Sequence, residues 1–449
     1  MLFLYLLSVW NVEVVSTSEN FFLPPLIAID SLDNPYILVT LERDTVNYLY
    51  YQILFTKSYG SWIADTFETH GTQTADISVD RSFRIWTIYC QKNPIDTTFA
   101  TVVAHKDVSG WVKDTVVADL SNRQTITTDA SGNPHIAYDR MSDLHGYYGY
   151  FDGLVWYNEV VDSYVGEIYE PSITLDSQGH PCISYRDDYW EGGKKRWKIY
   201  LCYATKMGNI WYSQKVDSTM EDYYTTPTSL AIDNSDLPHI VYNYNSFDLV
   251  YIHWDGSNWE IDTLGDCLIA TQRAIDTYSA GHPYILAELG GSSLLLYKSD
   301  GFWCAETLPL TPTTNFGGGG SLCIGNNGMI HIARIAFGNN NYEIHYLYGR
   351  PGGIEEGQKV PMVENLKLKL TPSIVSSDVQ IQYIVSDKEY IKLNLYDILG
   401  RKITKLMDGY VEPGLYNCSL NLSNLCVGIY FLVLEAENGI VTQKIIVAR

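Results

Sequence analysis

The sequence predicts an all-β protein built from a repeated four-stranded unit. One marker of the repeat is the stretch Pro171–Tyr185 (PSITLDSQGHPCISY), which reads as a strand, a tight polar turn and a second strand. Relatives of it recur along the first three quarters of the chain, at Ile27–Leu38, Ile77–Trp86, Ile126–Tyr138, Leu230–Tyr242, Ala274–Leu286 and Leu322–Ala333. Their turn positions are Asp30, Asp80, Asp129, Asp176, Asp233, Asp276 and Gly325. Neighbouring turns are about 50 residues apart, a period typical of repeat architectures.

A second marker keeps the same period. It is a Trp at the start of a short strand that ends in acidic or small polar residues, found at Trp10, Trp62, Trp111, Trp156, Trp211, Trp259 and Trp303. Between the two markers of a unit lies one more strand pattern, for example Leu249–Trp254, so each unit holds four short strands. A repeated four-stranded antiparallel unit is typical of a β-propeller, whose blades cover their faces and edges only by stacking in a closed ring.

The order of the markers predicts how the ring closes. The chain begins with a Trp strand at Trp10, and its last Asp-turn unit, at Gly325, has no Trp strand after it. Seven copies of each marker are present, so we predict seven blades, with residues near Trp10 completing the last blade beside Ile344–Tyr348. Leu2–Leu7 is then either a redundant strand or the remnant of a signal peptide.

The pattern changes after Tyr348. We predict a propeller domain at residues 1–348 and a linker at 349–364, where the sequence is rich in glycine and polar residues. Residues 365–449 return to short alternating strands, from Val379–Ile384 to Val441–Val447. This pattern predicts a small antiparallel β-sandwich.

The last 80 or so residues resemble the C-terminal sorting domain of type IX secretion (the Por system). The resemblance rests on LNLYDILGRKITKL (Leu393–Leu406), GLYNCSL (Gly414–Leu420), GIYFLVLEAENG (Gly428–Gly439) and the terminal KIIVAR (Lys444–Arg449). One departure is Thr371-Pro372, where the family usually has Asn-Pro. The residues that match the sorting motif are Gly400, Arg401, Gly428, Tyr430 and Lys444.

This resemblance implies an immunoglobulin-like sandwich and a bacterial protein whose partner is the type IX secretion machinery. The protein would then be secreted or held on the outer cell surface. The family's tail says nothing about what the rest of the chain does.

Composition narrows the choice of partners. The formal net charge of −22 would repel a phosphate backbone, so nucleic acid and anionic membranes are poor partners. No segment is long and apolar enough to span a bilayer. The eight cysteines form no CxxC or Cys–His metal spacing, and Cys182, Cys202 and Cys323 fall in apolar strand patterns that predict burial.

The recurring Asp, His and Trp residues are predicted to be structural. A turn Asp caps its own turn, and one carboxylate per turn is far from the about six to eight oxygens that calcium prefers. The second-strand histidines His135, His239 and His331 recur once per blade, which favours blade packing over a single site. We therefore predict no metal and no cofactor.

The candidate ligand site lies where the blades differ from one another. In propellers, the loops after the second strand and after the Trp strand share one face. The longest such loop is Arg186–Lys198, and its neighbours on that face include Asp139, Arg140 and Glu170. The predicted ligand-binding residues are Arg186, Asp187, Tyr189, Trp190, Tyr164, Glu167, Tyr169, Glu221 and Tyr223. Aromatic rings supply apolar area and carboxylates accept hydrogen bonds, a combination that suits sugars or extended peptides.

We therefore predict a carbohydrate- or protein-binding module rather than an enzyme. The alternative is an extracellular polysaccharide hydrolase or lyase that uses loop carboxylates of blades three to five, as paired carboxylates can act on a glycosidic bond. The turns before Trp156, Trp259 and Trp303 do not match the S/T-x-D-x-G-x-x-W box of sialidases. The sequence identifies no catalytic residue.

Overall fold

The chain divides into two compact units, Met1–Ile354 and Glu355–Arg449, in a computed structural model. The described residues run from 9 to 351 and from 366 to 447. Within these ranges the gaps are 21, 45–48, 97, 108, 163–166, 192–195, 221–226, 245–247, 279–281, 300–301, 339, 372–373, 376–377, 386–388, 398–400, 412–413, 424 and 437–438. Leu2–Leu7 lies outside the described residues.

The first unit is a set of antiparallel sheets, and all but one of them are formed by strands that follow one another along the chain. One seven-stranded sheet contains β2 (Leu26–Ile29), β3 (Pro35–Asp44), β4 (Leu49–Ser58), β5 (Ser61–Val79), β6 (Ile85–Lys92), β7 (Phe99–Asp107) and β8 (Gly110–Val117). Three four-stranded sheets follow. They contain β9 (Gln124–Thr128), β10 (Pro134–Asp139), β11 (Gly146–Phe151) and β12 (Trp156–Val160); β13 (Glu167–Leu175), β14 (Pro181–Glu191), β15 (Arg196–Met207) and β16 (Ile210–Met220); and β17 (Ser229–Ile232), β18 (Pro238–Tyr244), β19 (Asp248–Trp254) and β20 (Trp259–Gly265).

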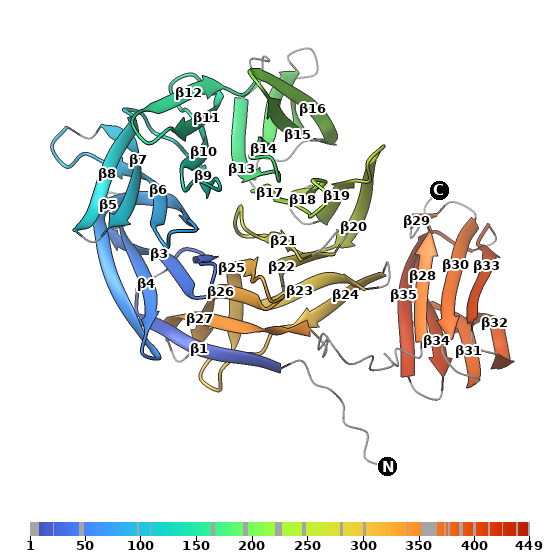
Figure 1. Ribbon diagram of the computed structural model, residues 1–449. Helices are drawn as coiled ribbons and strands as arrows, with labels where there is room; N and C mark the ends of the chain where they lie inside the picture. Colours follow the sequence, from blue (N-terminus) through green and yellow to red (C-terminus); the bar gives the residue numbers. More distant parts are fainter. Residues whose placement is uncertain are drawn as a thin grey trace. The chain divides into compact units, whose positions relative to one another are not determined.

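Two further four-stranded sheets complete this unit. One contains β21 (Ile275–Thr277), β22 (Pro283–Leu289), β23 (Ser292–Ser299) and β24 (Phe302–Thr307), and the other contains β25 (Phe316–Ile324), β26 (Ile330–Gly338), β27 (Asn341–Arg350) and β1 (Val9–Ser18). The sheets are arranged around a common centre, as in a propeller (Figure 1). The predicted all-β fold of repeated four-stranded sheets is therefore confirmed.

The ring closes through its N-terminal strand. β1 pairs antiparallel with β27, with Trp10 opposite Gly349 and Asn11 opposite Tyr348, which confirms the pairing predicted for residues near Trp10. β27 ends at Arg350, so Gly349 and Arg350 belong to this strand and not to the predicted linker. The first strand of the chain thus completes a sheet whose other strands come from residues 316–350.

The seven-stranded sheet exists because β5 belongs to two units. The first part of this 19-residue strand pairs with β4 between Ser61 and Gly71, and its last part pairs with β6 between Gly71 and Val79. β5 therefore serves as the outer strand of one unit and continues, without a loop, as the inner strand of the next.

The turn aspartates cap their turns, as predicted. In five turns the Asp Oδ1 accepts the backbone N–H groups two and four residues ahead, as Asp30 does from Leu32 and Asn34, both at 2.9 Å. The prediction is wrong for Asp276, because Tyr278 holds the equivalent place: its N–H bonds the carbonyl of His282. Asp276 instead accepts the backbone N–H of Ile324, in the neighbouring sheet, at 2.9 Å.

Several Trp strands are joined to the preceding four-stranded unit through a carboxylate. Trp62 donates its indole N–H to Glu13 at 3.0 Å, and Lys57 binds the same carboxylate at 2.6 Å. The same arrangement of a Trp, a Lys and an acid from the preceding four-stranded unit recurs at Trp111, Lys106 and Asp65, and at Trp303, Lys298 and Asp262. We call each of these sets a Trp–acid clasp. The sequence analysis gave no structural reason for the acidic residues of the Trp strands. These residues accept the hydrogen bonds of the clasps.

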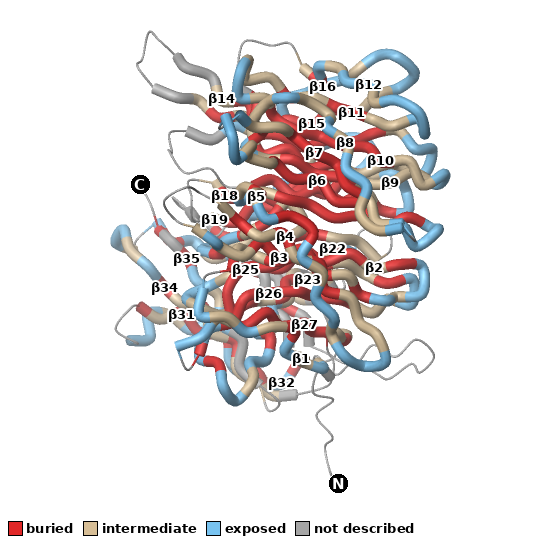
Figure 2. The backbone as a smooth tube through the Cα atoms, turned by 90° about the vertical axis from the view of Figure 1, so that its left-hand side faces the viewer, coloured by how far each residue is buried: buried red, intermediate tan, exposed pale blue. Residues whose placement is uncertain are grey.

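The hydrophobic cores lie between adjacent sheets, where buried residues concentrate along the strands (Figure 2). One core, for example, joins Val15 of β1 and Ile335 of β26 to Ile37 of β3. Cys182 and Cys202 are buried as predicted, whereas Cys323 is only partly buried. Since each sheet alone would expose both faces, this packing makes the stability of every sheet depend on its neighbours.

The second-strand histidines bind tyrosines of the third strand. His135, His239 and His331 each place Nδ1 at 2.6 to 2.7 Å from a tyrosine hydroxyl, that of Tyr148, Tyr251 and Tyr346 respectively. All three histidines are buried. A structural role for them, predicted from their recurrence, agrees with this geometry.

These histidines should make the propeller sensitive to acid. Burial lowers the pKa of His239 to about 4, against an unfolded value of about 6.5. A lowered histidine pKa contributes stability that is present above pH 6.5 and is lost as the pH falls towards 4, here up to about 3 kcal/mol. We expect the melting temperature to fall less between pH 7 and pH 5 in His239→Gln than in the parent protein. His180→Gln, at an exposed turn, is the control, and equal slopes in all three proteins would contradict the prediction.

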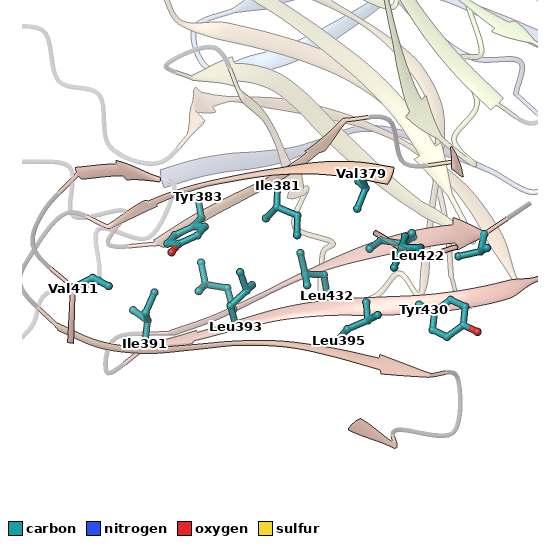
Figure 3. Packing of buried hydrophobic residues seen from close by; sticks show 13 residues of the cluster. Val379, Ile381, Tyr383, Ile391, Leu393, Leu395, Val411, Leu422, Tyr430 and Leu432 are labelled. Carbon is teal, nitrogen blue, oxygen red and sulfur yellow. The ribbon is translucent and has the colours of Figure 1, made fainter. Parts of the chain in front are cut away.

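The second unit consists of two sheets that enclose one core. A three-stranded sheet contains β28 (Leu366–Thr371), β30 (Asp378–Val385) and β33 (Gly414–Asn421). A five-stranded sheet contains β29 (Ile374–Val375), β35 (Gly439–Val447), β34 (Gly428–Ala436), β31 (Glu389–Asp397) and β32 (Lys402–Val411). Val379 and Ile381 of the first sheet face Leu393 and Leu432 of the second (Figure 3).

Candidate binding site

The predicted loop Arg186–Lys198 is largely a β-hairpin. β14 continues to Glu191 and β15 begins at Arg196, with Trp190 paired to Trp197 across the two strands. The prediction of a loop was wrong here because alternating aromatic and charged residues can extend an antiparallel ladder beyond the sheet's usual length. The residues predicted to lie before the fourth blade are also placed differently. Glu167, Tyr169 and Glu170 lie in β13 and not in a loop before it.

The predicted ligand residues fall into three groups. Tyr164, Glu221 and Tyr223 lie outside the described residues, and Glu167, Tyr189 and Trp190 are described only as strand positions. Arg186 and Asp187 are buried within β14, where Arg186 binds Asp188 at 2.9 Å and Asp187 binds Lys215 at 3.0 Å. Tyr169 is partly exposed and borders a cavity.

That cavity has a volume of about 630 Å³ and lies on the predicted loop face. We call it the loop-face cavity. Its walls come from the start of β4, the middle of β5, the end of β6, the start of β7, the segment between β8 and β9, and β13. The lining residues are Tyr50, Thr72, Gln73, Thr74, Lys92, Phe99, Leu120, Ser121, Asn122, Arg123, Tyr169 and Glu170. Three aromatic rings and a set of hydroxyl, amide and charged groups therefore face one space.

The polar wall of the cavity is held by a buried carboxylate beneath it. Asp139 Oδ1 accepts hydrogen bonds from the Ser121 hydroxyl at 3.0 Å and from the backbone N–H groups of Asn122 and Arg123, at 2.7 and 3.0 Å. Burial raises the pKa of the Asp139 carboxyl to about 6. These three bonds fix the segment that carries Arg123 before any ligand arrives, which lowers the entropic cost of binding.

Arg123 and Glu170 form an ion pair at the edge of the cavity. Arg123 Nε donates to Glu170 Oε2 at 2.9 Å, and Gln272 Nε2 lies 3.4 Å from the same oxygen. Glu170 sits at a bulge of β13 with a φ of 55°, a conformation that costs a non-glycine residue about 1 kcal/mol or more. Strained residues of this kind cluster at functional sites.

The centre of the ring is closed by a second ion pair. Arg273, just before β21, binds both carboxylate oxygens of Asp76 in β5, with Nη2 at 3.1 Å from Oδ2, and also the carbonyl of Ile126 at 2.6 Å. A small cavity of about 120 Å³ lies among described residues next to this ion pair in sequence, lined in part by Pro24, Thr271 and Arg123. The loop-face cavity is thus the roomier of the two.

Sequence reasoning missed most of the residues at this cavity. Tyr50, Lys92, Phe99 and Arg123 belong to the first three units, whereas the residues predicted from the sequence lie in units four and five. The pair Asn122-Arg123 could have indicated this site, because it is a polar segment between a Trp strand and an inner strand on the loop face. Tyr169 and Glu170 had been noted as neighbours of this face.

In the C-terminal unit, the predicted sorting residues differ in exposure. Arg401 is exposed, and its guanidinium binds Asp397 at 2.6 Å; Lys444 in β35 is also exposed. Tyr430 in β34 is buried and donates its hydroxyl to the carbonyl of Cys426 at 2.9 Å. Gly428 begins β34, and Gly400 lies outside the described residues.

Residues 371–448 match the family model of the secretion system C-terminal sorting domain. This tail carries the signal for export. The match indicates transport by type IX secretion to the cell surface or beyond, with the secretion machinery as a partner. No match was found among curated proteins. In the described part of the chain, no helix has the length and hydropathy of a membrane span.

Several solved structures are similar to this chain. The SapL1 lectin in complex with α-methyl fucoside is 11% identical with a TM-score of 0.41, covering 64% of this chain and 97% of the lectin. The fungal lectin of Aleuria aurantia, a six-bladed β-propeller, is 13% identical with a TM-score of 0.44, covering 65% and 97%. PorZ, a surface component of the type IX secretion system of Porphyromonas gingivalis, is 10% identical with a TM-score of 0.37, covering 95% and 70%.

Proposed function

We propose that this protein is an exported carbohydrate-binding module whose ligand site is the loop-face cavity. In this proposal the residues up to Arg350 form a propeller of seven blades, with β5 shared by the first two and β1 completing the last. Residues 351–364 are the linker, and residues 365–449 form an immunoglobulin-like sorting domain. The export signal supports action outside the cell, where glycans are abundant surface ligands.

The loop-face cavity is the observation that carries the proposal. Its volume of about 630 Å³ falls within the about 300–1,000 Å³ typical of ligand sites. Phe99 and Tyr169 are partly exposed and offer ring faces to the apolar side of a sugar, while Gln73, Thr74 and Asn122 offer hydrogen bonds to its hydroxyl groups. A site of this composition suits a small saccharide better than a flat protein surface.

The hydrolase alternative receives less support from the same residues. Glu170 is occupied by Arg123 and Gln272, which hold it as a charged partner and leave it poorly placed to give a proton to a leaving group. Asp139 has a suitable pKa of about 6 but is buried under the segment that it fixes. A binding role uses both carboxylates in the positions they occupy.

The binding role can be tested at Phe99. Replacing Phe99 with Ala removes a ring from the cavity wall and should weaken binding to a glycan by about tenfold, since an aromatic contact contributes about 1 kcal/mol beyond its area. Isothermal titration calorimetry with glycans selected from an array measures the loss. Phe83→Ala is the matched control, because Phe83 lies in the exposed turn at the other end of β6. Equal affinities for both variants would exclude the cavity as the glycan site, and no binding to any glycan would refute the function.

A further inference from the structure

The loop-face cavity is lined by an arginine, Arg123, whose terminal nitrogens have no partner among the described residues. Arg123 uses Nε for Glu170, and within the described part of the chain Nη1 and Nη2 have no hydrogen-bond partner. About a third of the side chain, 34%, remains exposed, and the residue lines the cavity wall. The ion pair with Glu170 therefore fixes the plane of the guanidinium while leaving its outer edge open.

An open guanidinium edge has a specific chemical preference. Two parallel N–H groups match the two oxygens of a carboxylate, whereas a neutral hydroxyl uses only one of them. Arg123 is also held from behind, because Asp139 binds its backbone N–H and Glu170 its Nε. A preorganised fork of this kind is suited to a carboxylate that enters from the cavity.

The other residues that line the cavity indicate which class of ligand would bear that carboxylate. Phe99 and Tyr169 supply ring faces, and Lys92 adds a second cationic side chain to the lining. Amide and hydroxyl groups of Gln73 and Thr74 lie in the same lining, where Gln73 Nε2 donates to the Tyr50 hydroxyl at 2.7 Å and Thr74 Oγ1 accepts from Gln124 Nε2 at 2.9 Å. A ligand with several hydroxyls would meet polar groups that are already held in place. A free carboxylate together with stacked rings and many hydrogen bonds is the chemistry of a sugar acid.

The net charge of −22 does not prevent an anionic ligand from binding in the cavity, because only nearby charges act strongly on it. At physiological ionic strength charges more than about 8 Å apart are largely screened, so most of the acidic residues do not reach the cavity. The charged residues of the lining are two cations, Lys92 and Arg123, and one anion, Glu170, which is paired with Arg123. Asp119, near the same segment, is paired with Arg140. Asp139 is buried below the wall and has a raised pKa of about 6.

We propose that the ligand is an acidic glycan and that a uronate carboxylate binds the Nη1 and Nη2 groups of Arg123. This inference rests on the proposed function, since it names the class of glycan that the same cavity takes. A carboxylate at a peptide C-terminus has the same head group, but it lacks the hydroxyls that the amide and hydroxyl lining would bind.

The test compares uronate oligosaccharides with their methyl esters, which keep the shape and remove the charge. Titration calorimetry of the full chain uses oligomers of galacturonate, glucuronate and mannuronate. We expect at least one acid to bind about 10- to 100-fold more tightly than its ester, the range for a charged bidentate pair. In Arg123→Gln that preference should disappear, and Arg123→Lys should keep only part of it because lysine lacks the fork. Arg81→Gln, in the exposed turn between β5 and β6, should behave as the parent protein.

Each other outcome counts against the inference. If an acid and its ester bind equally, or if only sulfated or neutral glycans bind, the carboxylate proposal is overturned while glycan binding stands. If peptides ending in a free carboxylate bind and no glycan does, both proposals fail. Melting curves of Arg123→Lys, which can keep the ion pair with Glu170, separate loss of the fork from loss of the fold. An unchanged acid preference in folded Arg123→Gln would also overturn the inference.

Discussion

Deleting Val9–Ser18 is expected to prevent the propeller from forming a stable ring. β1 supplies the outer strand beside β27, and without it β27 becomes an unpaired edge. The deletion also removes two links between sheets, the hydrogen bond of Trp10 to Glu306 and the Glu13 clasp with Trp62 and Lys57. Ladder hydrogen bonds at about 1 kcal/mol each, added to the buried Val15, approach the about 5–15 kcal/mol that stabilises a whole domain.

The measurement is thermal unfolding together with size-exclusion chromatography. The truncated chain should aggregate or lose its cooperative transition, and adding a synthetic peptide of Val9–Ser18 should restore part of it. Glu13→Gln is the milder control, because it keeps the strand and weakens only one clasp by about 1 kcal/mol. A truncated protein that stays monomeric and melts at the original temperature would show that ring closure does not depend on β1.

The repeat made the sheet architecture predictable, because each unit places a turn Asp and a Trp at equivalent positions, where they make the same hydrogen bonds. A turn Asp accepts the backbone N–H groups two and four residues ahead of it, and Trp62 donates to an acid of the neighbouring sheet, so both recur with the period. The same logic failed at Asp276. There the turn position is Tyr278, and a carboxylate two residues earlier has a different role, bonding to Ile324 of the next sheet.

The loop-face cavity was less predictable because no local pattern encodes it. Tyr50, Phe99, Arg123 and Tyr169 are separated by 24 to 49 residues along the chain and meet only when the ring is assembled. The free edge of Arg123 depends on where Glu170 lies, and that in turn depends on a bulge in β13. The order of the strands predicts the face on which the loop-face cavity lies, but the residues that line it follow from tertiary contacts.

Deleting the sorting domain is the second change for which we expect a large effect, here on export. A chain that lacks residues 371–448 should be retained in the cell, because the matched sorting domain carries the signal for type IX secretion. The propeller has its own cores and should remain folded, since the tail forms a separate compact unit. Immunoblots of medium, surface and cell fractions should show near-complete loss from the outside. Normal amounts of truncated protein in the medium would contradict the sorting assignment.

Within the tail, exposure separates recognition from folding. The secretion machinery can read only side chains that reach the surface, and Lys444 and Arg401 are exposed while Tyr430 is buried. Lys444→Ala should therefore lower secretion without changing the melting temperature of the full chain. Tyr430→Ala should lower both, because it leaves a cavity in the core at a cost of about 3 kcal/mol or more.

Lys405 is the matched control for Lys444. It too is an exposed lysine of the five-stranded sheet, in β32, and it binds Asp408 at 3.0 Å, so Lys405→Ala removes the same charge from the same unit. If both lysine variants reduce secretion equally, the machinery responds to net charge and not to a particular side chain. If neither does, Lys444 is not a recognition residue, and the signal must lie in the shape of the folded sandwich or in other exposed groups such as Arg401.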